Sequence, residues 1–162
     1  MNWLILILAC LVVCFGFVVL FGAPYLPTKK VQVATAFELL DLKKGQSFIE
    51  LGCGDGRVLL YGAKRGLCAT GYELNPVLVV IAKIVTYRYR SQVSVVWGNY
   101  WHKDWPKSDG IFCFLLDKYM PRLDKKIASE VKKPIKLVSY AFKIPNKKYV
   151  RVKQGVFLYQ YK

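Results

Sequence analysis

Three alternating glycines constrain the fold of this chain most, because they separate an apolar strand pattern from a helical one. Residues 47–51 form a short, largely apolar run that is typical of a buried strand, and the pattern from Val58 onward is helical. Gly52, Gly54 and Gly56 lie between the two. Glycine permits positive φ and lets a ligand approach the backbone, and the first N–H groups of the helix face the same place. The pattern predicts a strand, a ligand-binding turn and a helix.

A second signal is Glu73, which follows Gly56 by 17 residues and ends another apolar run. A carboxylate at the end of a neighbouring parallel strand can accept hydrogen bonds from both hydroxyls of a ribose. Dinucleotide-binding loops require glycine where this chain has Arg57, and the Gly-Lys-Ser/Thr of a phosphate-binding loop does not follow. Glu50, Asp55 and Glu73 surround the glycines, and their charge favours a cationic sulfonium ligand. These residues predict a site for S-adenosylmethionine.

Both segments resemble the motifs of class I S-adenosylmethionine-dependent methyltransferases. Residues 50–56 read Glu-x-Gly-x-Gly-x-Gly, and residues 71–76 read Gly-Tyr-Glu-Leu-Asn-Pro. With the lead-in at residues 27–29, Pro-Thr-Lys, the chain is similar to a family of small protein-lysine methyltransferases. That family includes the mitochondrial enzymes acting on adenine nucleotide translocase and on ATP synthase, with compact prokaryotic relatives. The resemblance covers most of residues 24–142 and implies a lysine side chain as the methyl acceptor.

The resemblance also implies roles for single residues. Asn99, after the third predicted strand, is expected to bind the adenine amino group, or else is a turn residue. Asp117 follows an apolar strand and is the candidate catalytic residue on the acceptor side, with a helix N-cap as the alternative. The Asn/Asp-Pro-Pro-Tyr/Phe motif of enzymes that methylate amide or base nitrogens is absent. The expected cofactor-binding residues are Glu50, Gly52, Cys53, Gly54, Asp55, Gly56, Glu73, Leu74, Asn99 and Tyr100.

Strand and helix patterns alternate through the rest of the chain, which predicts an α/β fold with a parallel sheet covered on both faces. Gln154-Gly155 separates two alternating runs and predicts an antiparallel hairpin. We expect the Rossmann-like class I methyltransferase sheet, closed by this hairpin and without its usual fifth helix. The predicted strands are 47–51, 68–74, 92–97, 110–116 and 135–142, and the predicted helices are 31–41, 57–65, 76–89 and 118–131.

The N-terminal segment predicts a transmembrane anchor. Residues 3–23 carry no charge, and 21 residues of helix span about 31 Å, close to the hydrocarbon thickness of a bilayer. All 25 Lys and Arg follow residue 28, which places the catalytic domain in the cytoplasm by the positive-inside rule. We expect an anchor at 1–23, a linker at 24–30 and a methyltransferase domain at 31–162. A cleaved signal peptide and a buried core helix are the alternatives.

Charge and composition limit the kinds of partner that the chain is expected to bind. The chain has 25 Lys and Arg against 10 Asp and Glu, which favours attraction to anionic lipid near a membrane-protein substrate. Nucleic acid is disfavoured because no RNA-binding module is evident. A single histidine, His102, and no Cys-x-x-Cys pair argue against a metal site. A phospholipid (ethanolamine headgroup) N-methyltransferase, an RNA methyltransferase and a non-catalytic membrane adaptor stay open as alternatives.

Overall fold

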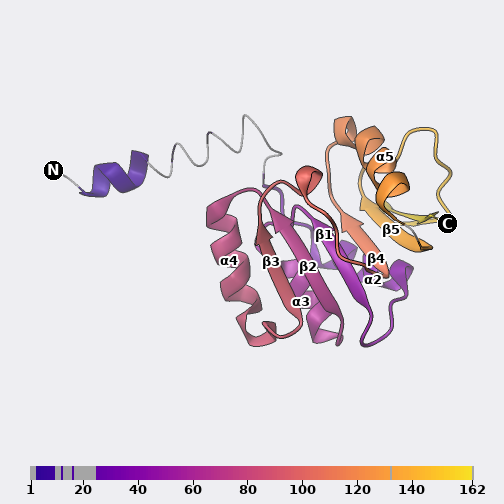
Figure 1. Ribbon diagram of the computed structural model, residues 1–162, viewed down its shortest axis with the longest axis horizontal. Coiled ribbons are helices and arrows are strands. Elements are labelled where there is room, and N and C mark those ends of the chain that lie inside the picture. Colours follow the sequence, from indigo (N-terminus) through magenta and orange to yellow (C-terminus); the bar gives the residue numbers. More distant parts are fainter. Residues whose placement is uncertain (1–2, 10–11, 13–15, 17–24, 132, 162) are drawn as a thin grey trace.

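A single mixed sheet organises the protein, and strands distant in sequence meet in it. The structure, a computed structural model, describes residues 3–9, 12, 16, 25–131 and 133–161. The sheet has seven strands in the order β3-β2-β1-β4-β5-β7-β6, parallel except for β7, which runs antiparallel to β5 and β6 (Figure 1). The strands are β1 (Ser47–Leu51), β2 (Cys68–Glu73), β3 (Val93–Trp97), β4 (Gly110–Cys113), β5 (Ile135–Tyr140), β6 (Arg151–Lys153) and β7 (Val156–Tyr161).

Helices cover the two faces of this sheet unequally. On one face, α2 packs on β5 and β7, α3 on β2, and α4 on β3. The other face carries α5, whose Leu123 and Ile127 are buried in a second apolar cluster with Ile111 and Leu137. The predicted α/β architecture is therefore confirmed. The helices are α2 (Lys30–Leu40), α3 (Arg57–Lys64), α4 (Pro76–Thr86) and α5 (Met120–Glu130), with short 3-10 helices η1 (Tyr87–Tyr89), η2 (Tyr100–His102) and η3 (Asp117–Tyr119).

On the face of the sheet that carries α5, two connections between strands are loops instead of α-helices. The connection from β3 to β4 contains only η2, and the connection from β5 to β6 contains no helix. In the second loop, Ile144 is buried, and its N–H donates to the Tyr159 hydroxyl at 2.9 Å. This contact fixes the loop against β7 and satisfies a buried backbone group. The expectation that the usual fifth helix is missing is confirmed.

The strand predicted at 110–116 is shorter in the structure, and the difference matters for the site. Its pairing with β1 and β5 stops at Cys113. Phe114 and Leu115 leave the ladder and line a cavity instead. The predicted helix at 118–131 likewise begins later, at Met120, after the single 3-10 turn η3. Apolar sequence alone cannot distinguish a residue in a buried strand from one in the wall of a cavity.

The predicted single-pass membrane localisation is corrected by the structure. Among the described residues of this segment, 3–9, 12 and 16 are helical. In the ranges that the structure describes, no helix has both the length and the apolar character required for a membrane crossing. Residues 10–11, 13–15 and 17–24 of the expected anchor lie outside these ranges. The prediction rested on hydropathy alone, and the cytoplasmic placement of the catalytic domain rested on the same anchor.

Candidate functional site

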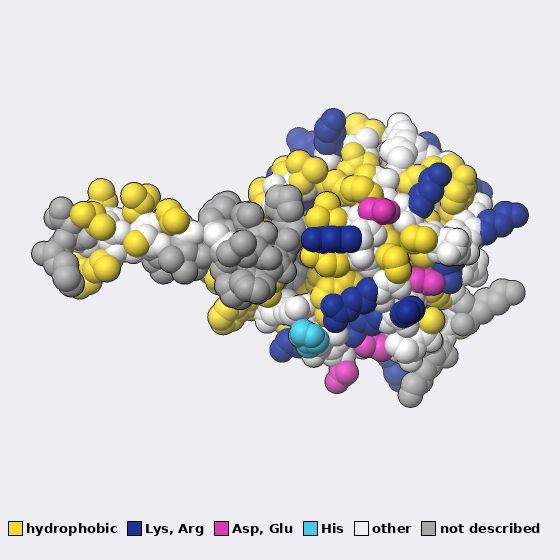
Figure 2. All heavy atoms as spheres, turned by 90° about the horizontal axis from the view of Figure 1, so that it is seen from above, with side chains coloured by type: hydrophobic (Ala, Val, Ile, Leu, Met, Phe, Trp, Pro, Cys, Tyr) yellow, Lys and Arg dark blue, Asp and Glu magenta, His cyan; other side chains and the backbone are white. Residues whose placement is uncertain are grey.

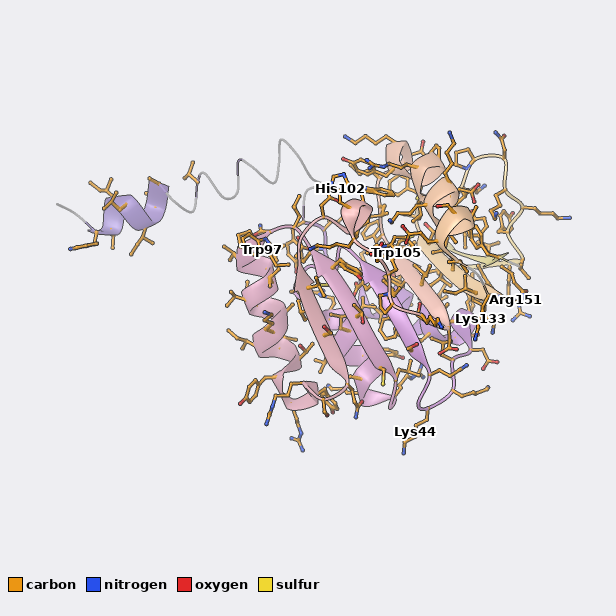
Figure 3. All side chains as sticks on the ribbon, in the orientation of Figure 1. Lys44, Trp97, His102, Trp105, Lys133 and Arg151 are labelled. Atoms are coloured by element: carbon orange, nitrogen blue, oxygen red, sulfur yellow. The ribbon has the colours of Figure 1, made fainter. Side chains whose placement is uncertain are left out.

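A cavity opens at the carboxyl ends of the parallel strands, where the strand order reverses between β1 and β4. Figure 3 shows this end of the sheet, with Trp97 and His102, opposite the end that carries Lys44. Ligands bind at such a reversal in open α/β sheets because neighbouring loops diverge there. The walls come from the glycine turn, the ends of β2 and β4, η2, η3 and residues 25–28. The lining residues are Tyr25, Leu26, Pro27, Thr28, Glu50, Gly52, Cys53, Gly54, Asp55, Arg57, Val58, Glu73, Leu74, Leu78, Asn99, Tyr100, Trp101, Phe114, Leu115 and Tyr119.

Glu73 joins the glycine turn to the start of α4. One carboxylate oxygen, Oε2, accepts the N–H of Gly54 at 2.8 Å, and Oε1 accepts the N–H of Asn75 at 2.8 Å. The Asn75 side chain in turn accepts the N–H of Val77 at 2.9 Å and caps α4. Glu73 is only 8% exposed, so its geometry is fixed before any ligand arrives. Each carboxylate oxygen retains a lone pair, and together they fit two ribose hydroxyls.

Glu50 is a buried carboxylate whose oxygen Oε2 has no hydrogen-bond partner. Its side chain is 3% exposed and lines the cavity. Desolvation, followed by the charges of Asp55 and Glu73, raises the pKa of Glu50 well above its ordinary value of 4.5. An unpartnered buried carboxylate fits a cationic group such as the ammonium or sulfonium of S-adenosylmethionine. The residues present therefore fit the cofactor that the sequence predicts.

The raised pKa of Glu50 predicts a pH-dependent stability of the ligand-free protein. A carboxyl with a raised pKa binds its proton more tightly in the folded state, so its contribution to stability falls as the pH rises above 4.5. Glu50→Gln removes this titration. The melting temperature of the variant, relative to that of the unaltered protein, should therefore increase from pH 4.5 towards neutral pH. Circular dichroism measures both melting temperatures. A difference between them that stays constant across this pH range would contradict the assignment.

Residues 25–28 form a strap across the glycine turn that sequence reasoning missed. A side chain at Gly54 would come within 2.9 Å of the Tyr25 ring, so the ring lies directly against the turn. Arg57 holds the strap in place, because its Nη1 donates to the Thr28 carbonyl at 3.4 Å and its Nη2 to the Tyr25 hydroxyl at 3.5 Å. The same guanidinium pairs with Asp55 at 2.8 Å. Asp55 thus lines the cavity as expected, but it is partly neutralised by Arg57.

The three glycines of the turn have different functions. Gly52 and Gly54 line the cavity and have positive φ, 79° and 53°. Gly56 does not line it. An added Cβ on Gly56 would lie 3.0 Å from the Ala82 side chain and 3.1 Å from its Cα, so this glycine permits the close approach of α3 and α4. Gly56 thus has a packing role in the structure, and the cofactor contact expected of it stays a prediction.

The remaining expected cofactor residues also lie at the cavity. Cys53 is buried, burial raises the pKa of its thiol, and its expected cofactor contact stays a prediction. Leu74, Asn99 and Tyr100 line the wall. The Asn99 side-chain oxygen accepts the N–H of Trp101 at 3.0 Å, which turns the chain into η2. The Asn99 Oδ1 retains a second lone pair, which is the acceptor that an adenine amino group needs, and the expected adenine contact stays a prediction.

Asp117 lies outside the cavity wall. The side chain is exposed at the start of η3, and no hydrogen bond to it is present within the described part of the chain. Neither the catalytic role nor the helix-capping role is therefore visible in its contacts, and the catalytic role stays a prediction. Phe114, Leu115 and Tyr119, which flank it in sequence, line the cavity instead. Nothing in their residue types distinguished them from ordinary core residues.

Comparisons with known proteins agree with this geometry. The family described as the ANTKMT methyltransferase domain matches residues 50–151. The chain is 29% identical over 125 residues to an ATP synthase lysine N-methyltransferase of Xenopus laevis, covering 76% of this chain and 55% of that protein. It is 29% identical over 148 residues to a protein-lysine N-methyltransferase of Saccharolobus islandicus, covering 84% of this chain and 92% of that protein. The chain thus spans about half the length of the vertebrate relatives.

Solved structures show the same fold. An RNA methyltransferase from Salinibacter ruber, in complex with S-adenosyl-L-homocysteine, superposes with a TM-score of 0.77 at 23% identity and covers 84% of this chain and 92% of its own. A methyltransferase from Thiobacillus denitrificans in the same kind of complex gives a TM-score of 0.59 at 19% identity, covering 76% and 54%. At such low identity the likeness concerns the fold. With the family match over residues 50–151, it places the chain in the ANTKMT methyltransferase domain family, which has the class I S-adenosylmethionine-dependent methyltransferase fold.

Proposed function

We propose that this chain transfers methyl groups from S-adenosylmethionine to lysine side chains of proteins. The observation that carries the proposal is the division of the cavity into two chemically different halves. One half presents the carboxylates Glu50 and Glu73 beside the glycine turn, and the other is uncharged and largely aromatic. The aromatic half consists of Tyr100, Trp101, Phe114, Leu115 and Tyr119.

The acidic half is assigned to the cofactor. Glu73 presents its two oxygens for the ribose, and Glu50 offers its unpartnered oxygen to the cationic end of the ligand. S-adenosylmethionine supplies an electrophilic methyl group on a sulfonium. The protein then has to hold an acceptor in line with that methyl and exclude water, which is a positioning task that requires no metal and little acid–base chemistry.

The aromatic half is assigned to the acceptor. A lysine ammonium must lose a proton before its nitrogen can attack, and from a pKa near 10.4 this costs about 4 to 5 kcal/mol at pH 7. Burial against apolar and aromatic surface disfavours the ammonium and lowers that cost. Burial raises the pKa of Tyr100, one residue of this wall, above its usual range. An uncharged wall thus supports an amine that enters neutral.

We infer the substrate class from the names of the relatives. By name they act on lysines of ATP synthase and of adenine nucleotide translocase, and we extend lysine as the acceptor to this chain. A lysine in a membrane protein, approached through attraction of the basic surface to anionic lipid, is the narrower form of the proposal. The formal net charge of +15 supports that form.

Transfer of label from tritiated S-adenosylmethionine tests the proposal. The purified protein is incubated with host extract, which is then separated into protein, lipid and RNA, and the protein is hydrolysed for amino-acid analysis. We expect label in methyl-lysine with the unaltered protein and a large loss with Glu73→Ala. Label confined to lipid would support an ethanolamine headgroup acceptor, and label confined to RNA would support a nucleotide acceptor. Failure to bind the cofactor at all would indicate a non-catalytic adaptor.

A further inference from the structure

Two exposed cations stack on rings of the aromatic half of the cavity, which we call the acceptor wall. The Arg122 guanidinium lies 4.5 Å from the centre of the Trp101 ring, and the Lys118 ammonium lies 5.0 Å from the centre of the Tyr119 ring. Trp101 and Tyr119 themselves line the cavity, with ring centres 6.2 Å apart. Stacking on an aromatic face is attractive and limits the freedom of a long side chain. We call Lys118 and Arg122 the basic rim.

The spacing of these residues places them along one side of η3 and α5. Lys118, Arg122 and Lys126 are four residues apart, which aligns side chains on one helix face. Lys126 continues the row 4.9 Å from the centre of the Trp105 ring, but it pairs with Glu130 and so adds little free charge. Figure 2, which looks onto this end of the sheet, shows Lys and Arg side chains among hydrophobic ones with few acidic groups between them.

Carboxylates do not neutralise the basic rim within the part of the chain that the structure describes. None of the ion pairs found there includes Lys118 or Arg122. The acids of α5 are engaged elsewhere, Asp124 with Lys147 and Glu130 with Lys126. Asp117 is the exposed acid that neighbours the basic rim in sequence. Both cations are exposed, so their charge is available to a molecule that approaches the acceptor wall.

This charge opposes the very substrate that the proposed function requires. A lysine approaches as a cation, and both the basic rim and the formal net charge of +15 repel it. Acidic residues beside the target lysine reverse that repulsion, because they pair with Lys118 and Arg122 while the lysine passes the aromatic wall.

We propose that Lys118 and Arg122 select acceptor lysines that are flanked by acidic residues. This inference rests on the proposed function, because it names the substrate class of the same site. The partner is an acidic segment of protein, with carboxylates close to the target lysine in sequence or in space. Electrostatic complementarity of this kind acts mainly on encounter and on the choice among partners.

Peptides that each contain a single lysine flanked by Glu, by Gln or by Arg test the selection. With the unaltered protein at low salt, we expect kcat/KM for the Glu-flanked peptide to exceed that for the Gln-flanked peptide about fivefold, on the scale of two exposed ion pairs. The Arg-flanked peptide should be the poorest substrate. The double variant Lys118→Gln/Arg122→Gln should lose most of the difference. The charge-preserving exchange Lys118→Arg/Arg122→Lys should retain it.

A matched control distinguishes an effect of the basic rim from an effect of the net charge of the protein. Lys83 and Arg88 are exposed on α4 and η1, away from the cavity, and Lys83→Gln/Arg88→Gln removes the same total charge. This control should preserve the selectivity. Equal loss in both double variants would reduce the effect to overall charge and overturn the inference.

Peptide binding and methyl transfer are measured separately, so that a failure of this inference can be distinguished from a failure of the proposed function. Fluorescence anisotropy of dye-labelled peptides reports the preference for acidic flanks without any reaction. Equal binding and equal methylation of Glu- and Gln-flanked peptides would overturn the inference and leave the proposed function standing. Label in RNA and in no peptide, reduced by Lys118→Gln/Arg122→Gln, would overturn both and assign the basic rim to phosphates.

Discussion

Replacing Glu73 with Ala should weaken binding of S-adenosylmethionine by about 1.5 to 3 kcal/mol, roughly a 10- to 150-fold rise in Kd, on the scale of charge-assisted hydrogen bonds. The substitution removes the acceptors expected to hold the ribose. It also leaves the N–H groups of Gly54 and Asn75 without the oxygens that they contact at 2.8 Å. Isothermal titration calorimetry with S-adenosylmethionine or S-adenosylhomocysteine measures the loss.

Two further variants interpret this result. Glu73→Gln is not a mild substitution here, because both carboxylate oxygens accept backbone N–H groups and an amide would turn a donor toward one of them. It should therefore resemble Glu73→Ala. Glu38→Ala removes an exposed acid that pairs with Lys153, far from the cavity in its contacts, and should leave affinity unchanged. Wild-type affinity in a folded Glu73→Ala protein would disprove the site assignment.

Replacing Gly56 with Ala should destabilise the fold by about 2 to 5 kcal/mol, through two separate causes. Its φ of 79° costs an L-residue about 1 to 2 kcal/mol. The added Cβ would lie 3.1 Å from the Ala82 Cα, and overpacking of a core contact costs about 1 to 3 kcal/mol. At about 2 to 4 °C per kcal/mol for a domain of this size, the melting temperature should fall by about 4 to 20 °C.

Gly45→Ala is the matched control, because Gly45 has a similar φ of 87° with nothing within 4 Å of an added Cβ. This control carries the backbone strain without the contact, so its fall in melting temperature should be clearly smaller. Thermal unfolding of the two variants without ligand isolates the packing of α3 on α4. Equal shifts would mean that Gly56 is required for its backbone conformation alone.

Sequence patterns predicted the part of the site whose residues lie close together in the chain. The strand, the glycines and the helix lie within residues 47–64, and their periodicity and turn chemistry carry the information. Glu73 was predictable because parallel strands place their carboxyl ends at one edge of the sheet. The packing of Gly56 on Ala82 was not predicted. That contact joins two helices, and no spacing rule distinguishes it from a ligand contact.

The other half of the site depends on contacts between residues distant in sequence. Tyr25 lies on the glycine turn and bonds Arg57 across 32 positions, which no periodic pattern encodes. Phe114 and Tyr119 look like core residues in sequence and become cavity wall because β4 ends at Cys113. The membrane helix predicted at residues 3–23 rested on hydropathy and length, whereas no helix in the described part of the chain is long and apolar enough to cross a membrane.

The strap at residues 25–28 is joined to the wall of the cofactor cavity by Arg57. Tyr25 and Thr28 form part of the wall, and Arg57 ties them to the first turn of α3. Arg57 also pairs with Asp55 in the glycine turn, so a single side chain braces two walls of the cavity against each other.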